Sequence, residues 1–372
     1  MSAVSTPERA PQRLPLIRRP RLRRPRLKNA RQSFLLTFIA VALLAGFLSP
    51  LLRSVSVSIK NAQQVNTVGA PILPSDPKRL AVNGKTYDIY QVPIDGTLRE
   101  LALVRKGRTD ADFLDPANPS APPITWQGSW RSLTPAWELA PHPENYVNAW
   151  NLIKFPRLLF NTIVLALIGM VGTLISCTLV AYGFARFRFP GRNALFILLI
   201  ATIFLPATVT IVPTYTTWVW LGMLKPEIGY LAWAPLLVPT FFANAYDVFL
   251  MRQYFLTIPR EMDEAAAMDG AGPFRTLISV ILPQSWPVII AVGIFHFIYA
   301  WNDFFGPLIY LGAKPDLQPL SVGLASFNAI RAVREPGVVQ AGTIMTLLIP
   351  VVLFVIFQRV FTRGIVITGV EK

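Results

Sequence analysis

Polar residues inside otherwise apolar runs are the first candidates for chemistry in this sequence. Asp303 follows Trp301 and Asn302 in one such run, and Asn244 and Asp247 lie in another. An ionised carboxylate near the centre of a bilayer costs about 2.5–3.5 kcal/mol, so each is expected to face protein or water. Carboxylates and amides bind hydroxyl groups, and an indole ring stacks on an apolar ring face. We interpret Asn244, Trp301, Asn302 and Asp303 as part of a translocation path or as helix–helix contacts, and favour the second interpretation for Asp303.

No residue pattern predicts catalysis or metal binding. His142 and His296 are the two histidines, and neither has a partner histidine or cysteine at metal-ligand spacing. The segment 83–86 (NGKT) resembles the end of a phosphate-binding loop, but that motif requires a glycine where Arg79 stands. We therefore predict no catalytic residue, no metal site, no cofactor and no ATP hydrolysis in this chain.

The composition is typical of a membrane protein. The chain is 53% hydrophobic and 15% charged, whereas a soluble chain carries about 25% charged residues. Much of the net charge of +15 comes from a basic arm that holds nine arginines and one lysine between Arg9 and Arg31. Interleaved prolines and the lack of aromatic residues argue against a folded nucleic-acid reader. We expect a cytoplasmic topogenic tail at 1–32 and no nucleic-acid partner.

Six stretches are long and apolar enough to cross about 30 Å of hydrocarbon. The first is read as an uncleaved signal anchor because no cleavage site follows it. Basic residues then place both termini on the cytoplasmic side. The expected fold class is an all-α integral membrane protein with six transmembrane helices and a small β-containing extracytoplasmic insert between the first two. The expected spans are 33–52, 158–185, 194–220, 231–250, 287–311 and 340–361, the last five within a core at 158–372.

The insert at 53–157 has a different composition, with many prolines and turn signals. The segments 86–93 and 97–104 flank Asp95-Gly96, a pair that predicts a β-hairpin. We expect a small β-rich domain. It either contacts a partner or substrate outside the membrane or is a decorated loop, and the sequence leaves both possibilities open.

A charged loop at 252–286 lies between the fourth and fifth expected spans. Three consecutive alanines favour a short helix, Gly270 ends it, and Pro273 can begin a second helix that runs to Pro283. The first helix presents alanines and Met268 beside Glu264, a surface that can dock into a groove on another protein. The alternative is a solvated linker.

The same loop resembles the EAA signature of inner-membrane permease subunits of ATP-binding-cassette importers. That pattern is EAA, three residues, glycine, nine residues and I-x-L-P, and here valine at Val280 replaces the isoleucine. The segments 182–192 and 301–308 resemble the hinge and the fifth span of carbohydrate-importer permeases. The similarity, to the maltose-type second permease subunit, covers about 145–372 and leaves the insert unmatched.

The resemblance implies a division of labour among several chains. A second homologous permease would complete the path, a dimer of cytoplasmic ATPase subunits would hold ATP and Mg, and an extracytoplasmic solute-binding protein would deliver sugar. The complex would lie in the lipid of a bacterial inner membrane. The residues implied in coupling to the ATPase are Glu264, Ala265, Ala266, Met268, Asp269, Gly270 and Pro283.

Two other classes of protein compete with this interpretation. A self-sufficient secondary transporter or channel would be expected to show an intramembrane ion-coupling group, and only Asp303 lies deep in a span. A membrane-embedded enzyme would need clustered catalytic groups, which two separated histidines do not provide. Copurification of an ATPase subunit distinguishes the first hypothesis from both.

Overall fold

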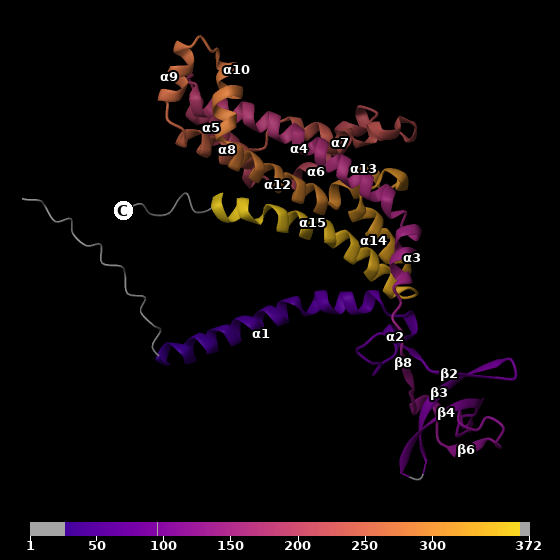
Figure 1. Cartoon of the computed structure of the whole chain (residues 1–372). Coiled ribbons are helices and arrows are strands. Elements are labelled where there is room, and N and C mark those ends of the chain that lie inside the picture. Colours follow the sequence, from indigo (N-terminus) through magenta and orange to yellow (C-terminus); the bar gives the residue numbers. More distant parts are fainter. Residues whose placement is uncertain (1–26, 95, 365–372) are drawn as a thin grey trace, which may run out of the picture. The chain divides into compact units, whose positions relative to one another are not determined.

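The computed structural model describes residues 27–94 and 96–364 (Figure 1). The chain divides into two compact units, 1–52 and 53–372. Helix α1 (Leu27–Ser58) provides the described part of the first unit. Its residues 32–52 are all exposed although most are apolar. Such a surface is expected for a helix whose neighbours are lipid or other chains.

Helices account for most of the described chain. Among the described residues, four helical stretches are long and apolar enough to cross a membrane: α1, α4 (Phe155–Arg186), the stretch Glu227–Thr257 and α15 (Pro336–Gly364). Two bent helix pairs raise the number to six if each pair is one span. Together with the small sheet between α1 and α4, this architecture confirms the predicted fold class.

Two expected spans are broken within their length. The stretch 194–220 was expected as one helix, but it divides at Leu205 and Pro206 because proline lacks an N–H and disfavours helix in the residue before it. The stretch 231–250 breaks before Asn244 and continues seven residues beyond its expected end. The elements are α5 (Arg192–Ala201), η2 (Thr202–Phe204), α6 (Ala207–Trp220), η3 (Pro226–Trp233), α7 (Ala234–Leu237), η4 (Val238–Phe241) and α8 (Ala245–Thr257).

The fifth expected span, 287–311, is interrupted at Asp303. Helix α12 (Trp286–Asn302) ends there, and α13 (Phe305–Leu311) begins two residues later. The chain returns to α15 through η6 (Pro315–Leu317) and α14 (Leu320–Arg331). The break places the Asp303 carboxylate at a helix end, where a backbone N–H is free to bind it.

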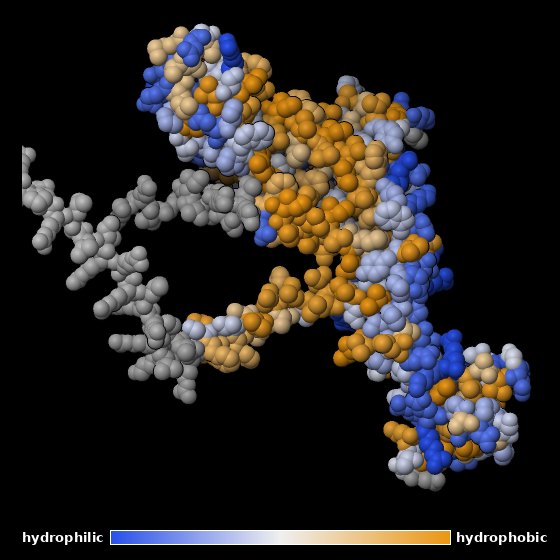
Figure 2. Space-filling view, in the orientation of Figure 1, coloured by the Kyte–Doolittle hydropathy of each residue, from blue (hydrophilic) through white to orange (hydrophobic). Residues whose placement is uncertain are grey.

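Helix α4 is central to the membrane part, where it packs against α8 and α12. A buried cluster joins these three helices and includes Cys177, Val248, Met251 and Val292. At Gly172 an added Cβ would lie 2.8 Å from Thr240 Oγ1, so only glycine allows this close approach. Figure 2 shows hydrophobic surface over this bundle and a mixture of hydrophilic and moderately hydrophobic residues over the α9–α10 loop at its end.

The insert contains a twisted antiparallel sheet with strand order β2-β3-β4-β5-β6 and β7 paired with β3. The hairpin prediction is confirmed, since β3 and β4 pair in register from Ile89–Ala102 to Ile94–Thr97. A small core around Val92, Leu101 and Phe113 covers one face. The elements are α2 (Ala62–Asn66), β1 (Ser75–Pro77), β2 (Arg79–Val82), β3 (Lys85–Ile94), β4 (Thr97–Lys106), β5 (Asp110–Leu114), β6 (Ile124–Gln127), η1 (Trp130–Ser132), β7 (Thr134–Pro135) and β8 (Trp137–Leu139).

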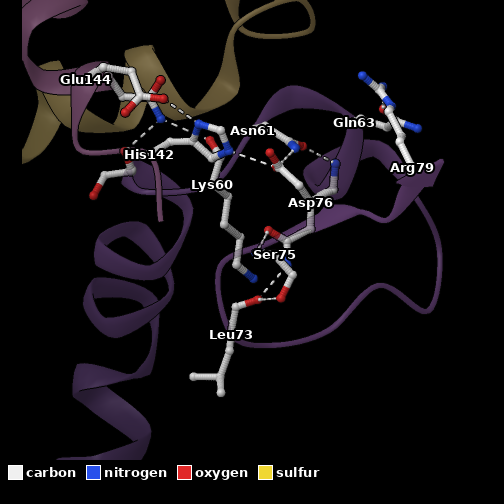
Figure 3. Close-up of polar contacts among 12 residues, drawn as sticks. Lys60, Asn61, Gln63, Leu73, Ser75, Asp76, Arg79, His142 and Glu144 are labelled. Carbon is white, nitrogen blue, oxygen red and sulfur yellow. Dashed lines mark hydrogen bonds and ion pairs between the residues drawn. The ribbon is translucent and has the colours of Figure 1, made fainter. Parts of the chain in front are cut away.

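A polar network joins the insert to α3 (Glu144–Leu152), the short helix that precedes α4 (Figure 3). The His142 ring lies between two carboxylates: its Nε2 is 2.8 Å from Asp76 Oδ1, and its Nδ1 contacts Glu144. Asn145 Nδ2 donates to the carbonyls of Ser58 (3.0 Å) and Lys60 (2.9 Å). The segment that leads into α4 is therefore held by hydrogen bonds to the end of α1 and to the insert.

Candidate functional site: coupling loop and intramembrane cavity

The loop between α8 and α12 contains the short helix α9 (Glu261–Met268), which ends where Gly270 predicts. Gly270 has φ +76°, the left-handed conformation that glycine adopts without strain. The Gly270 N–H donates to Ala267 O (3.0 Å), and the Ala271 N–H donates to Ala266 O (2.9 Å). These two bonds form a Schellman motif, which fixes both the last turn of α9 and the direction of the chain after it.

Helix α9 has one inner face and one outer face. Asp263 and Ala266, one turn apart, face the membrane helices, and Ala266 is buried. The expected coupling residues Glu264, Ala265, Met268 and Asp269 are exposed, and the Met268 side chain is 84% exposed. An exposed methionine flanked by small residues and acids leaves a surface that another protein can cover.

The beginning of the loop is attached to α4 through Arg186. Its Nη1 lies 3.0 Å from Asp263 Oδ2, and its Nη2 donates to Ile258 O at 3.0 Å. The Arg186 side chain is only 7% exposed. A guanidinium forms geometrically fixed bonds because its donors lie in one plane. Arg186 therefore holds the end of α8 and the first turn of α9 against the end of α4.

The second arm of the loop is attached one helical turn earlier on α4. The Tyr182 hydroxyl donates to Pro273 O at 3.1 Å, at the start of α10 (Pro273–Thr276). A π-helical turn, η5 (Leu277–Ile281), follows, and Leu277 and Ile281 are buried in the core formed by α4, α8 and α12.

Helix α11 (Leu282–Gln284) contains the exposed Pro283 of the signature. The chain then turns by 83° into α12, and Tyr254 Oη donates to Gln284 O at 3.1 Å. Both arms of the loop are therefore tied to membrane helices, while the outer face of α9 is not covered. In Figure 1, α9 and α10 form a hairpin at the end of α4 and α8.

A cavity of about 700 Å³ lies among the membrane helices. Asn244 and Asp303 line it, and so do Asp247, His296 and Tyr299. No lysine or arginine belongs to its described lining. The remaining lining residues are Thr173, Thr210, Thr214, Trp218, Pro235, Leu236, Pro239, Thr240, Phe242, Tyr246, Phe295, Gly306 and Tyr310.

Helix breaks and cross-helix bonds position the polar groups of this cavity. Asn244 caps α8 by accepting a bond from the Asp247 N–H (2.9 Å), and its Nδ2 donates to Asp247 Oδ2 (2.6 Å). Asp303 Oδ1 accepts the Gly306 N–H (3.3 Å). The His296 Nδ1 lies 3.0 Å from Thr173 Oγ1 on α4. The cavity therefore presents carboxylates, an amide, an imidazole and hydroxyls in an otherwise apolar surrounding, a composition suited to hydroxyl-rich solutes.

The four residues that the sequence suggested for the path or for helix contacts lie in different surroundings. Asn244 and Asp303 line the cavity, and the Asp303 carboxylate also accepts the Gly306 N–H in the first turn of α13. Trp301 is buried in a different cluster and stacks on Phe297 at 5.7 Å between ring centroids. Asn302 is exposed and donates to Ile298 O in its own helix (2.8 Å). Neither Trp301 nor Asn302 lines the cavity.

Sequence reasoning assigned no path role to two residues that the cavity contains. Asp247 was named in the fourth expected span but was left out of the path candidates, and the structure buries it beside Asn244, just after the break in the span. Tyr299 lies one helical turn before Asp303, so its side chain is on the same face as Asp303. This spacing is the one feature of the sequence that could have identified Tyr299 as a cavity residue. His296, which was considered as a metal ligand, contacts Thr173 of α4 and borders the cavity.

A broken-helix bundle with a polar cavity and a tethered, exposed loop is the arrangement expected of a membrane transport subunit. Residues 172–366 match the family described as "Binding-protein-dependent transport system inner membrane component". This match spans more than half of the chain, so the chain belongs to that family.

Curated relatives agree with the family match. The sn-glycerol-3-phosphate transport system permease protein UgpE of Rhizobium meliloti is 36% identical over 217 residues, which cover 58% of this chain and 74% of that protein. The osmoprotective compounds uptake permease protein GgtD of Synechocystis sp. is 31% identical over 212 residues, which cover 57% of this chain and 69% of that protein. The chain is thus a permease subunit of an ATP-binding-cassette importer in a bacterial inner membrane, as predicted.

The fold is also similar to a solved structure. A bacterial ABC transporter involved in the import of the acidic polysaccharide alginate superposes with a TM-score of 0.62 at 19% identity. The match covers 90% of this chain and 97% of that chain. At this identity the likeness concerns the fold alone.

Proposed function

We propose that the chain forms, with a second homologous permease, the membrane path for import of a carbohydrate. A dimer of cytoplasmic ATPase subunits, which holds ATP and Mg, supplies the energy, and an external solute-binding protein delivers the sugar. The observation that carries the proposal is the double attachment of the coupling loop to α4, with the outer face of α9 left exposed.

In this mechanism the coupling loop transmits the movement of the ATPase to the membrane helices. A force applied to α9 reaches α4 through Arg186 and Tyr182, because both arms of the loop bond to the last turns of that helix. Closure of the ATPase dimer moves α4, and α8 and α12, which pack on it, move as well. The loop is thus a lever between a nucleotide-dependent partner and a bundle with two arrangements.

The length of α4 supports the proposed orientation. Its 32 residues span about 48 Å, more than the hydrocarbon thickness of about 30 Å. The coupling loop contacts the end of α4, and α3 and the insert adjoin its beginning. With the loop on the cytoplasmic side, where the ATPase is, the insert is extracytoplasmic and both termini are cytoplasmic.

The charge of the cavity supports a neutral solute. Asp247 and Asp303 place two carboxylates on its surface, and its described lining includes no basic side chain. A phosphate or carboxylate group in this cavity would meet like charges in a medium of low dielectric constant. Neutral polyhydroxylated solutes instead find hydrogen-bond partners in the carboxylates and hydroxyls, and aromatic faces in Tyr246 and Tyr299.

A pair of surface variants tests the coupling assignment. Met268→Glu places a charge at the centre of the exposed α9 face. We expect at least about a tenfold loss of ATPase affinity, because the residues that dominate binding cluster near the centre of an interface, and loss of uptake. Ile330→Glu is the matched control, because Ile330 is also exposed (78%) and lies just before the α14–α15 turn. Copurification of the ATPase measures the effect, and undiminished uptake by Met268→Glu would disprove the assignment.

Isosteric variants test the path separately from coupling. Asp303→Asn and Asp247→Asn keep the shape of each side chain but remove its charge. We expect reduced sugar uptake by the reconstituted complex with unchanged ATPase copurification. If both variants transport at the wild-type rate, the cavity is not on the path.

A further inference from the structure

A second recess, of about 480 Å³, lies at the hinge between α4 and α5, beside the start of the coupling loop. Its residues come from two segments, the hinge and the turn that precedes α9. They are Arg188, Phe189, Gly191, Arg192, Asn193, Ala194 and Arg260. Three of these seven residues are arginines and none is acidic, so the recess is strongly positive.

The three arginines differ from Arg186, which lies a few residues away. Arg186 is buried and paired with Asp263. Among the ion pairs of the described residues, none includes Arg188, Arg192 or Arg260. Arg192 Nη1 donates to the Phe187 carbonyl (3.1 Å), an uncharged partner. The positive charge of the recess is therefore not neutralised by neighbouring carboxylates.

The backbone adds a positive contribution at the same place. Helix α5 begins at Arg192, with Gly191 (φ +77°) before it, no side-chain cap and no acid in its first turn. The first N–H groups of a helix lack intrahelical partners and carry the positive end of its dipole. Basic side chains at this end repel the dipole, and a bound anion relieves that repulsion and accepts the free N–H bonds.

The position of the recess indicates which anion. The hinge joins two membrane-spanning elements, so it lies near the level of the lipid headgroups. Apolar side chains exposed on α5, including Leu195 and Leu198, and the exposed Phe189 ring lie beside it along the chain. A phosphate bound by the arginines would have acyl chains alongside these apolar groups.

We propose that this recess binds the phosphate of an anionic phospholipid headgroup. Because Arg260 immediately precedes α9, the bound lipid also contacts the base of the coupling loop. The site is independent of which solute the importer carries. A free phosphate ion offers the same chemistry, and the experiment separates the two sources.

The test uses the full chain assembled with its coexpressed partner subunits in nanodiscs of phosphatidylcholine with increasing phosphatidylglycerol. Native mass spectrometry measures the phosphatidylglycerol that remains bound. Since a basic residue near a membrane surface contributes about 1 kcal/mol, we expect about fivefold weaker retention for Arg260→Gln and about 25-fold for the Arg188→Gln/Arg192→Gln pair. The charge-preserving Arg188→Lys/Arg192→Lys pair should retain most of the lipid, and it also shows whether the hinge still folds.

The control is Arg334→Gln. Arg334 is an exposed arginine between α14 and α15 that forms no ion pair with the described residues. Its variant should bind lipid as the wild type does. Equal retention by the Gln pair and the wild type would overturn the proposal. So would displacement of the lipid by millimolar inorganic phosphate, which indicates a soluble-ion site. Loss of ATPase copurification with unchanged lipid retention would instead assign the arginines to the ATPase interface.

Discussion

At its coupling end, α4 is held by the permanently charged Arg186, whose guanidinium bonds Asp263 and the Ile258 carbonyl. At its other end, the adjoining segment is held by His142, which lies between Asp76 and Glu144. An arginine stays charged at any physiological pH, whereas a histidine changes charge near neutrality. The segment before α4 therefore depends on a group that titrates, whereas the end of α4 next to α9 depends on a guanidinium.

The largest expected effect comes from breaking the ion pair at the coupling end. Arg186→Met leaves the Asp263 carboxylate without its partner and should cost about 1.5–3 kcal/mol, the range for a hydrogen bond to a charged group. A lower melting temperature of the solubilised complex and weaker ATPase copurification measure the loss. Arg186→Lys should recover part of both, since it keeps the charge but not the planar donors. A wild-type melting temperature for Arg186→Met would show that the pair does not hold the loop.

The next largest effect is expected from overpacking at Gly337, where α15 approaches α3. A Cβ added at Gly337 would lie against the Lys60 carbonyl oxygen and 2.5 Å from Asn145 Nδ2. Gly337→Ala must therefore push α15 away from α3 and should cost about 1–3 kcal/mol, as overpacking does. The melting temperature of the complex reports this cost. Gly183→Ala, where an added Cβ meets nothing within 4 Å, is the control.

A smaller effect is expected at Gly270, where backbone conformation and not space requires glycine. An added Cβ has open space, but φ is +76°. Gly270→Ala should cost about 1–2 kcal/mol, the strain of a left-handed residue with a side chain. Because the residue sets the exit direction of α9, uptake should fall more than the melting temperature does. Equal uptake by Gly270→Ala and the wild type would remove this residue from the coupling geometry.

The smallest effect is the pH dependence of the insert attachment. Burial lowers the pKa of His142, but its hydrogen bonds to Asp76 and Glu144 outweigh burial and raise the pKa above its ordinary value of 6.5. A raised pKa means that the stabilisation is fully present below pH 6.5 and is lost as the pH rises through the higher folded-state value.

Hydrogen exchange of the whole complex measures this pH dependence. Amides at 59–76 and 137–145 should be better protected at pH 6 than at pH 8.5 after correction for intrinsic rates. His142→Gln should show the same protection at both pH values. A pH difference that survives in His142→Gln would assign the titration to another group.

Parts of the fold and of the site could be predicted because they are local. The apolar runs predict the spans, the Asp95-Gly96 pair predicts the hairpin of β3 and β4, and Gly270 predicts the end of α9. Each depends on composition or on the φ/ψ preference of one residue. The interruption at Asp303 is different, since the apolar run continues through it to Leu311.

The sequence by itself determined the class of protein, the position of the short helix α9 and the polar residues available within the membrane. Only the tertiary structure decided which of them meet. Arg186 reaches a carbonyl 72 positions away, and His296 reaches a threonine 123 positions away. The tertiary structure also placed Asn244, Asp247 and Asp303 in one cavity and Trp301 outside that cavity. Composition and periodicity record what each segment prefers locally, whereas these contacts depend on how α4, α8 and α12 pack together, and no single segment encodes that packing.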